Sequence, residues 1–385
     1  MTKPVYDFDR PIDRSGTASE KWDRYKGRGI LPMWVADMDF ASPPEVLEAL
    51  HQRVDHGVFG YTHAPDELIE SIRDYWRRSY DWQIEPQWLV FLPGLVSGLN
   101  IACRAVGEAG DAVMTAVPVY PPFLTAPGFS GRELIAVPLK PAEEHWSFDF
   151  EQMAQAVTPR TKLFILCNPH NPVGRVFSKS ELLKLVDFCE TYDLILCSDE
   201  IHCDLILEPG LAHIPTATLG EAAARRCITL MAPSKTYNIA GLGCSFAVIS
   251  DERLRRRFKA AMQGIVPHVN ALALTAATAA YQHCEAWRQA LIAYLRRNRD
   301  RVIEAIGLIP ALKVSPVEAT YLAWIDARAA KIDQPRHFFE AAGVGMNDGA
   351  DFGAPGFVRL NFGCPAALLD QALARIAIAM EKVQG

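Results

Sequence analysis

Short apolar runs alternate with amphipathic stretches along most of the chain. The apolar runs with the composition of buried strands are 88–94, 111–118, 132–139, 161–169, 194–200, 227–234 and 244–250. Between them lie segments such as 178–192, "SKSELLKLVDFCETY", whose apolar positions recur at the spacing of an α-helix. Near-continuous apolar strands separated by helices are typical of a mostly parallel sheet covered on both faces. We therefore expect an α/β fold.

The pattern changes after about residue 285. A long charged helix is predicted over 285–307, and the later stretches "TYLAWIDA" and "GFVRLNFG" have strand composition. We expect a large domain at 51–284 and a smaller α+β domain at 285–385. The N-terminal segment 1–50 is assigned to the small domain, and its extended stretch "LPMWVADMDF" is expected to cross between the two.

Composition and charge exclude several classes of protein. The 385 residues carry a formal net charge of −6, so the chain lacks the basic surface that nucleic acid requires. No apolar run is long enough to span a membrane, and the N-terminus "MTKPVYDFDRPIDR" has no apolar core of a secretion signal. The nine cysteines form no C-x-x-C pair, which favours a reducing compartment and no metal site. We expect a cytoplasmic protein.

Chemically distinct groups stand at the carboxyl ends of the predicted strands, the edge where α/β sheets bind ligands. The strand 88–94 runs into "PGLVSGLN", a glycine turn that opens a helix, and a helix start suits a phosphate. The turn "NPHNPVG" places the amide of Asn171, "SDEIH" places Asp199, and the next strand ends at Ser234 and Lys235.

Pyridoxal 5′-phosphate (PLP) uses all of these groups. Its aldehyde forms a Schiff base with a lysine amine, and its ring nitrogen needs an acid that keeps it protonated as an electron sink. Its ring hydroxyl accepts a hydrogen bond, and its phosphate binds N–H groups and hydroxyls. A lysine at the end of a core strand is either an exposed charge that caps the sheet or a desolvated amine. Because it ends a strand beside these other groups, we expect Lys235 to be desolvated and nucleophilic.

Motifs in order along the chain carry a resemblance to a known family. "NPHNPVG", "SDEIHCDL", "SKTYNIAGL" and "GFVRLNFG" resemble those of the class I/II aminotransferase-fold (fold type I) PLP enzymes. "MWVADMDF", "HGVFGYTH" and "SDEIH" resemble the MalY/PatB-like branch, the cystathionine β-lyases and cysteine-S-conjugate β-lyases. The resemblance spans essentially the whole chain and implies the fold-type I transferase architecture.

The resemblance implies a role for each matching residue. Lys235 is the expected Schiff-base lysine and moves protons at Cα, Asp199 pairs with the ring nitrogen, and Asn171 donates to the ring hydroxyl. Tyr120 stacks on the ring, or is a loop aromatic that covers the core. Arg359 clamps the substrate carboxylate, since an arginine inside an apolar strand calls for an anionic partner.

The phosphate is expected at the start of the helix after residue 94. The resemblance implies backbone contacts from Gly94, Leu95 and Val96 and a hydroxyl contact from Ser234. It also implies that Tyr61 reaches the phosphate and substrate from the partner subunit, which makes the active unit a homodimer with shared sites. Otherwise Tyr61 is an interfacial core aromatic.

The chain departs from many aminotransferases of this fold at two positions. Gly243 stands where those enzymes carry a phosphate-binding arginine, and His202 replaces a tyrosine that contacts the ring hydroxyl. Both departures match the β-lyase branch. His202 is either a cofactor contact or an ordinary histidine between the domains. Trp34, with Asn171, is expected at the substrate, although Trp34 and Tyr321 are equally compatible with core positions.

The resemblance implies α,β-elimination of L-cystathionine or related cysteine S-conjugates, which gives pyruvate, ammonia and a thiol. An aminotransferase of amino acids shares every cofactor contact and stays open as an alternative. A regulatory PLP-binding protein that contacts another macromolecule is the second alternative.

Overall fold

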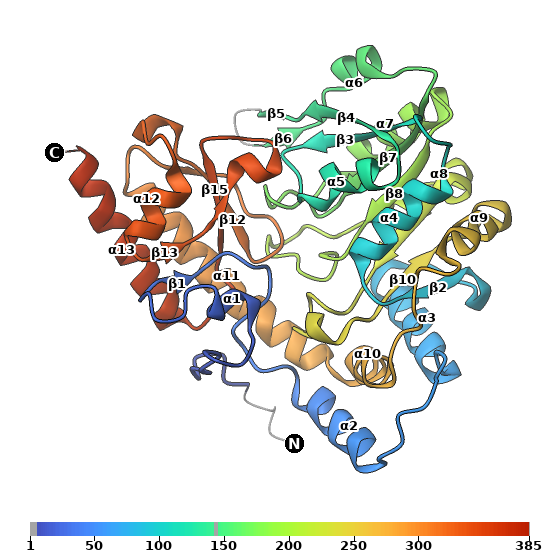
Figure 1. Ribbon diagram of the computed structural model, residues 1–385, viewed down its shortest axis with the longest axis horizontal. Helices are drawn as coiled ribbons and strands as arrows, with labels where there is room; N and C mark the ends of the chain where they lie inside the picture. The colour runs from blue at the N-terminus through green and yellow to red at the C-terminus, as the bar shows by residue number, and fades with distance from the viewer. Residues whose placement is uncertain (1–5, 142–144, 385) are drawn as a thin grey trace.

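A computed structural model describes residues 6–141 and 145–384 of the chain (Figure 1). Its largest sheet has seven strands in the order β2-β10-β9-β8-β7-β3-β4. These are β2 (Leu89–Leu92), β3 (Ala112–Val117), β4 (Glu133–Pro138), β7 (Thr161–Cys167), β8 (Ile195–Asp199), β9 (Cys227–Met231) and β10 (Ser245–Val248). All neighbours are parallel except β10, which is antiparallel to both β2 and β9. The expected mostly parallel α/β sheet is confirmed.

Helices cover both faces of this sheet because side chains alternate along its strands. On β7, Leu163 and Ile165 face one apolar cluster, and Phe164 and Leu166 face the other. The first cluster is closed by α4 (Leu95–Ala105), α5 (Pro122–Phe129) and α9 (Glu252–Met262). The second is closed by α3 (Asp66–Tyr80), α6 (Phe150–Ala156), α7 (Lys179–Thr191), α8 (Glu221–Arg226) and α10 (Ala271–His283).

The predicted helix at 178–192 is bounded by its own capping residues. The Ser178 side chain accepts from the backbone N–H of Glu181, whose carboxylate accepts from the Ser178 N–H, a reciprocal capping box. The helix proper therefore begins at Lys179 and ends at Thr191, one residue inside each predicted boundary. The end residues act as caps rather than as helical residues.

A second sheet of four antiparallel strands lies beside the first (Figure 1). It consists of β11 (Lys313–Val314), β12 (Leu322–Asp326), β15 (Phe357–Asn361) and β14 (Asn347–Asp348), with α11 (Glu285–Gly307), α12 (Pro335–Ala341) and α13 (Ala366–Gln384). Its strands all fall within the predicted small domain, and those of the seven-stranded sheet fall within the large one. The domain boundaries at residues 50 and 285 stay a prediction.

The remaining elements lie outside the two larger sheets and the helices listed above. They are α1 (Glu20–Asp23), α2 (Pro44–Asp55), the pair β5 (Lys140–Pro141) and β6 (Trp146–Ser147), and β1 (Leu31–Pro32), which pairs with β13 (Val344–Gly345). Single 3₁₀ turns lie at Pro86–Trp88, Thr216–Thr218, Ala240–Leu242, Arg328–Ala330 and Gly349–Phe352.

The extended stretch 31–40 is held by two asparagines from distant parts of the chain. Asn361, at the end of β15, donates to the carbonyl of Val35 and, at 2.7 Å, to that of Asp37. Asn238, which follows β9, donates to the carbonyl of Phe40 at 2.7 Å. The stretch therefore contacts both sheet regions, as expected for a crossing segment.

A buried charge cluster fixes the chain just before this stretch. Lys21 is fully buried, and its Nζ lies 2.7 Å from Asp39 Oδ2. The other oxygen of Asp39 accepts from Arg14 at 2.7 Å and from the indole of Trp22 at 2.8 Å. Arg14 also pairs with Asp37 at 2.7 Å, so two cations face two acids. The charges compensate one another, which makes their burial tolerable.

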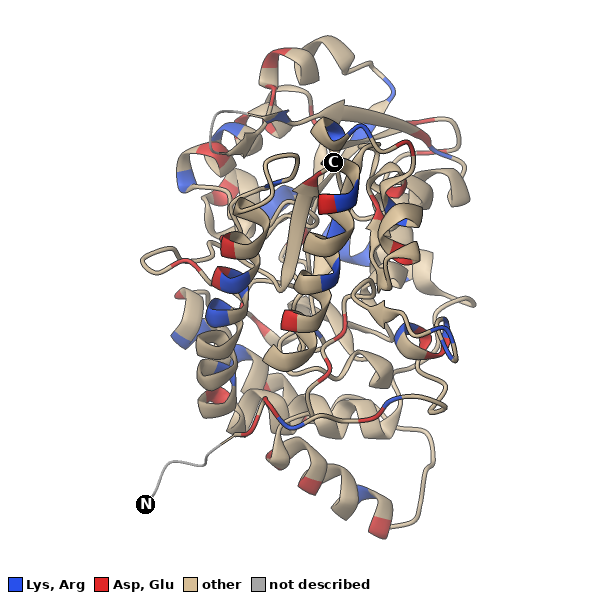
Figure 2. Ribbon diagram, turned by 90° about the vertical axis from the view of Figure 1, so that its left-hand side faces the viewer, with Lys and Arg blue, Asp and Glu red and all other residues tan. Residues whose placement is uncertain are grey.

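Charged residues, cysteines and helix lengths in the described ranges agree with the composition of the sequence. Acidic and basic residues are interspersed on the face that Figure 2 shows, so that face carries no single-sign field. All nine cysteines are buried and unpaired. None of the helices in the described ranges has the length and apolarity needed to cross a membrane.

Asp39→Asn is expected to lower the free energy of unfolding by about 3 kcal/mol, because it leaves the buried ammonium of Lys21 without its closest counter-charge. Glu252→Gln is the matched control, since Glu252 pairs with Arg256 in an exposed ion pair. Its effect should be about 0.5 kcal/mol or less. Urea unfolding followed by tryptophan fluorescence measures both, and equal effects of the two substitutions would contradict the role given to the cluster.

Candidate active site

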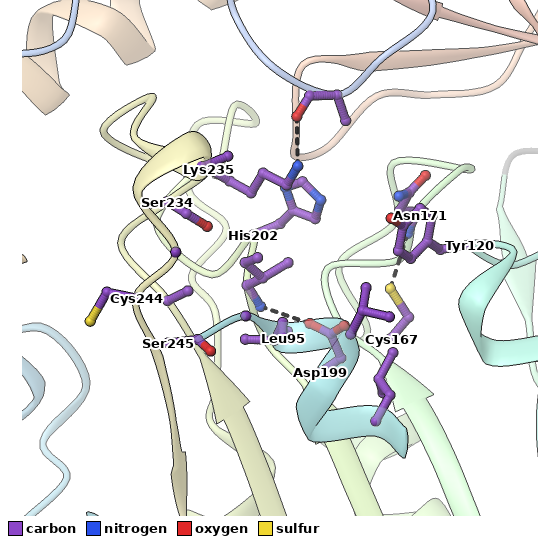
Figure 3. A pocket seen from close by; sticks show the side chains of 18 of the residues that line it. Leu95, Tyr120, Cys167, Asn171, Asp199, His202, Ser234, Lys235, Cys244 and Ser245 are labelled. Carbon is purple, nitrogen blue, oxygen red and sulfur yellow. Dashed lines mark hydrogen bonds between the residues drawn. The ribbon is translucent and has the colours of Figure 1, made fainter. Parts of the chain in front are cut away.

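A cavity of about 170 Å³ lies at the carboxyl ends of the central strands (Figure 3). Most residues predicted from the strand ends line it together: Gly94, Leu95, Val96, Tyr120, Asn171, Asp199, His202, Ser234 and Lys235. Their side chains come from the ends of β8 and β9, the start of α4, and the turns after β3 and β7. Parallel strands bring these segments, far apart in sequence, to one edge.

Lys235 points into the cavity from the turn after β9. Its Nζ donates to the carbonyl of Ala36 at 2.6 Å, and protein surrounds it except on the cavity side. Burial, together with the positive charge of Arg359, lowers the pKa of this amine to about 8. The amine therefore loses its proton near neutral pH, which makes it a nucleophile.

Asp199 is the last residue of β8 and is buried at the base of the cavity. Its carboxylate accepts from the backbone N–H of Ile201 at 3.1 Å, and no cation of the described chain lies within ion-pair distance. Burial raises the pKa of Asp199 to about 7, a net result in which the hydrogen bond from Ile201 and the charge of Lys235 oppose the effect and Glu200 supports it. A buried acid of this kind is suited to pair with a cationic ligand atom.

The start of α4 forms an open cradle for an anion. Gly94 caps the helix without a side-chain hydrogen bond, so the first backbone N–H groups face the cavity unpartnered by a cap. The space where a Cβ of Gly94 would stand is empty to 4 Å. Ser234 and Ser245 also line the cavity. Helix dipole, N–H groups and hydroxyls together favour a phosphate.

Gly243 has a physical reason to be glycine. Its φ is +76°, in the left-handed region, and an added Cβ would lie 2.7 Å from the carbonyl oxygen of Pro93. An arginine at this position would require the backbone to move. The phosphate contact that many aminotransferases make from here is therefore incompatible with this local geometry.

Arg359 lies on β15 behind the cavity and is only 3% exposed. Its guanidinium donates to the side-chain oxygens of Asn171 at 2.9 Å and Asn347 at 2.7 Å, and to the carbonyl of Trp34 at 3.0 Å. All three partners are neutral, and the described residues supply no anionic one. Burial accordingly lowers the pKa of Arg359 to about 10. The expected anionic partner is absent from the described residues, and the Nε of Arg359 has no hydrogen-bond partner among them.

The aromatic neighbours fall into two groups. Tyr120 borders the cavity, and its backbone N–H donates to the carbonyl of Asn171 at 3.1 Å. Tyr321 is fully buried and lies one layer behind the cavity, where its hydroxyl donates to the carbonyl of Ala36 at 2.9 Å. Trp34 also lies outside the cavity lining, and its indole donates to the carbonyl of Lys21 at 3.0 Å.

His202 and Tyr61 have opposite environments. His202 is buried in the cavity wall, its Nδ1 has no hydrogen-bond partner among the described residues, and burial lowers its pKa to about 3. Burial therefore favours the neutral imidazole. Tyr61 is fully exposed and does not line the cavity of its own chain.

Sequence reasoning missed two contacts of the site. The carbonyl of Ala36 accepts from both Lys235 and Tyr321, but a backbone acceptor leaves no signal in residue type. Asn347 faces Arg359 across the β14–β15 pair, whereas its stretch "MNDG" indicates only a turn. Only the pairing of β14 with β15, the strand that carries Arg359, identifies Asn347 as a contact of the site.

The sequence profile described as "Aminotransferase class I and II" matches residues 29–376. The chain belongs to the aminotransferase class I and II family. It is 37% identical to the cystathionine beta-lyase PatB of Bacillus subtilis over 97% of this chain and 99% of that protein. The crystal structure of OvoB is 46% identical, with a TM-score of 0.96 over 97% and 99% of the chains. That of Treponema denticola cystalysin, which contains PLP, is 33% identical, with a TM-score of 0.94 over 99% and 100%.

These matches confirm the family and the fold inferred from the sequence motifs. The profile of the aminotransferase class I and II family covers both sheet regions, from the crossing segment to α13. The matched residues include all those that line the cavity at the strand ends.

Reductive methylation of the ligand-free chain should report the lowered pKa of Lys235 directly, because only the neutral amine reacts with formaldehyde. With a pKa of about 8, the labelling rate should rise about tenfold between pH 7 and pH 9 and then level off. Mass spectrometry of the peptides gives the rate, with the exposed Lys179 as internal reference. A Lys235 rate that still climbs steeply above pH 9.5 would contradict the assigned desolvation.

Proposed function

We propose that this chain is a PLP-dependent carbon–sulfur β-lyase that converts cystathionine or related cysteine S-conjugates to pyruvate, ammonia and a thiol. One observation carries the proposal. A lysine that deprotonates near neutral pH, a buried acid without a cation and a helix start without a side-chain cap meet in one cavity beside an arginine without an anion. Each group lacks the partner that PLP or an amino acid supplies.

The residues of the cavity fit the cofactor. Lys235 would hold the aldehyde carbon, Asp199 the ring nitrogen, and the start of α4 with Ser234 the phosphate. Tyr120 would cover the ring, and Asn171 with His202 would lie at the ring hydroxyl. When bound, PLP supplies an electron sink for the negative charge left at Cα after proton loss. Beside the protonated ring nitrogen the pKa of Asp199 would fall again, so that the carboxylate would be charged. The charged carboxylate would keep the ring nitrogen protonated, and the ring would then accept the negative charge.

The chain's own groups then direct the reaction at the substrate. Arg359 would bind the substrate carboxylate in a bidentate pair, with Asn347 and Asn171 fixing its guanidinium. This orientation sets the Cα–H bond for removal. The neutral amine of Lys235 takes the Cα proton, the Cβ–S bond breaks with its electron pair on sulfur, and the thiolate leaves. Water completes the conversion of the remaining fragment to pyruvate and ammonia.

Elimination is favoured over transamination by the local geometry at Gly243. Transamination leaves the cofactor as a free amine that only non-covalent contacts retain, and Gly243 denies the site an extra cation there. Elimination restores the covalent link to Lys235 in each turnover. Among the relatives, the Corynebacterium glutamicum cystathionine beta-lyase is 34% identical, whereas the Pseudomonas aeruginosa arginine–pyruvate transaminase is 27% identical.

The exposed surface around Tyr61 supports a homodimer as the active unit. Tyr61 is fully exposed in the single chain, and Val54, Val58 and Phe59 beside it expose half or more of their surface. A second copy of the chain would cover this patch and bring Tyr61 of each subunit to the other subunit's phosphate cradle.

Purified protein loaded with PLP should release pyruvate, ammonia and thiol from cystathionine without any keto acid. Lys235→Ala should lose at least about a thousandfold in kcat, because the group that moves the Cα proton is gone. Borohydride reduction followed by peptide mapping checks that the cofactor was fixed on Lys235. Turnover that depends on an added keto acid, with no thiol released, would instead establish the aminotransferase.

A mixture of inactive Lys235→Ala chains and Tyr61→Phe chains should recover activity, because one site of each hybrid dimer then receives both wild-type groups. The test applies if Tyr61→Phe is itself severely impaired. Recovery should approach a quarter of wild-type activity per site after complete random exchange, measured with differently tagged chains. Proven exchange without recovery would show that Tyr61 serves its own chain.

A further inference from the structure

A second buried acid directly follows Asp199 at the end of β8. Asp199 lines the cavity (Figure 3), whereas Glu200 is fully buried and does not line it. Because side chains alternate along a strand, Glu200 lies on the same side as Ser198, whose hydroxyl donates to it at 2.8 Å. The backbone N–H of Glu200 donates to the carbonyl of Leu230 on β9 at 2.9 Å. Glu200 is therefore held behind the acid that faces the cavity.

Three hydrogen-bonding groups hold the carboxylate of Glu200. Its Oε1 accepts from the Ser198 hydroxyl and, at 2.9 Å, from the backbone N–H of Thr216. Its Oε2 lies 2.7 Å from Nε2 of His213, whose side chain is fully buried. No lysine or arginine in the described ranges lies within 4.0 Å of Glu200. Whether the charge of Glu200 is cancelled therefore depends on His213.

The second ring nitrogen of His213 decides the charge of this pair. Its Nδ1 is buried and has no hydrogen-bond partner among the described residues. A cationic His213, or a protonated Glu200 that donates to Nε2, would leave a buried N–H at Nδ1 without an acceptor, which is costly. A neutral imidazole that donates from Nε2 leaves only a lone pair there. The geometry therefore favours a charged Glu200 beside a neutral His213.

We propose that Glu200 is a positioning residue for the cofactor: its buried negative charge acts together with Asp199 to keep the ring nitrogen of PLP protonated. The inference rests on the proposed pairing of Asp199 with that nitrogen. The two acids are consecutive, with Cα atoms about 3.8 Å apart, and the protein interior around them screens charge poorly. The charge of Glu200 also supports the raised pKa of Asp199, as expected if its field reaches the cavity. A neutral His213 leaves that charge in place.

A competition between two cofactors isolates this effect. Protein freed of cofactor is offered equal amounts of PLP and 1-deaza-PLP, in which a C–H group replaces the ring nitrogen, and the bound cofactors are then released and quantified by chromatography. E200Q should lower the preference for PLP about tenfold, the order of one unit charge in the protein interior. Lost packing or phosphate binding would weaken both cofactors alike and leave their ratio unchanged. S198A and H213Q are the matched controls and should keep the wild-type ratio, because each replaces a neutral partner of Glu200 and retains its charge.

D199N should lower the same ratio further, which tests the pairing on which the inference rests. An unchanged ratio in E200Q, beside a lowered one in D199N, would overturn the role of Glu200 alone. An unchanged ratio in both variants would overturn the pairing of Asp199 and this inference with it. If E200Q does not fold, the double variant E200Q/H213Q, whose two amides can bond to each other, is compared with H213Q, from which it differs only in the charge at residue 200. The competition involves no turnover, so failure to release thiol from cystathionine would overturn the lyase function and leave the ratios to decide this inference.

Discussion

The site depends on burying charges without giving them partners. Lys235, Asp199 and Arg359 are each surrounded by protein, and in the described chain each meets only neutral hydrogen-bonding groups. Desolvation then moves all three pKa values toward the neutral form, to about 8, 7 and 10. Burying these three groups without partners of opposite charge raises the free energy of the folded chain. A cofactor and substrate with the complementary charges relieve it on binding.

Holding such groups apart requires a rigid frame, and the crossing segment supplies it. Asn361 fixes its backbone from one side and Asn238 from the other, while the compensated charges around Asp39 anchor it below. Its two carbonyls at Trp34 and Ala36 then position Arg359 and Lys235. The charges around Asp39 pair with one another and stabilise the segment. The charges of the cavity have no partners of opposite sign in the described chain and are suited to binding.

Much of the large sheet and of the site was predictable from the sequence, because the carboxyl ends of parallel strands lie at one edge of a sheet. The apolar runs located every strand of the large sheet, and parallel connectivity required Asn171, Asp199 and Lys235 to meet at one edge. The helix predicted at 178–192 is one residue shorter at each end, because Ser178 and Tyr192 are its caps, whereas the helix predicted at 285–307 has the expected bounds. Two contacts could not be predicted from the sequence. Ala36 accepts through its backbone carbonyl, which any residue type has, and Asn347 meets Arg359 only because of the register between β14 and β15.

The turn at Gly243 also limits how this chain can change. Its backbone is left-handed, and the Pro93 carbonyl fills the space where any side chain would begin. A mutational route toward an arginine-held phosphate cannot therefore start at this codon. The strand-to-helix turn at residues 93–94 must first move, and that same turn opens α4, where we propose that the phosphate binds. A side chain at residue 243 and the present path of the backbone at residue 93 therefore exclude each other, so the two positions can change only together.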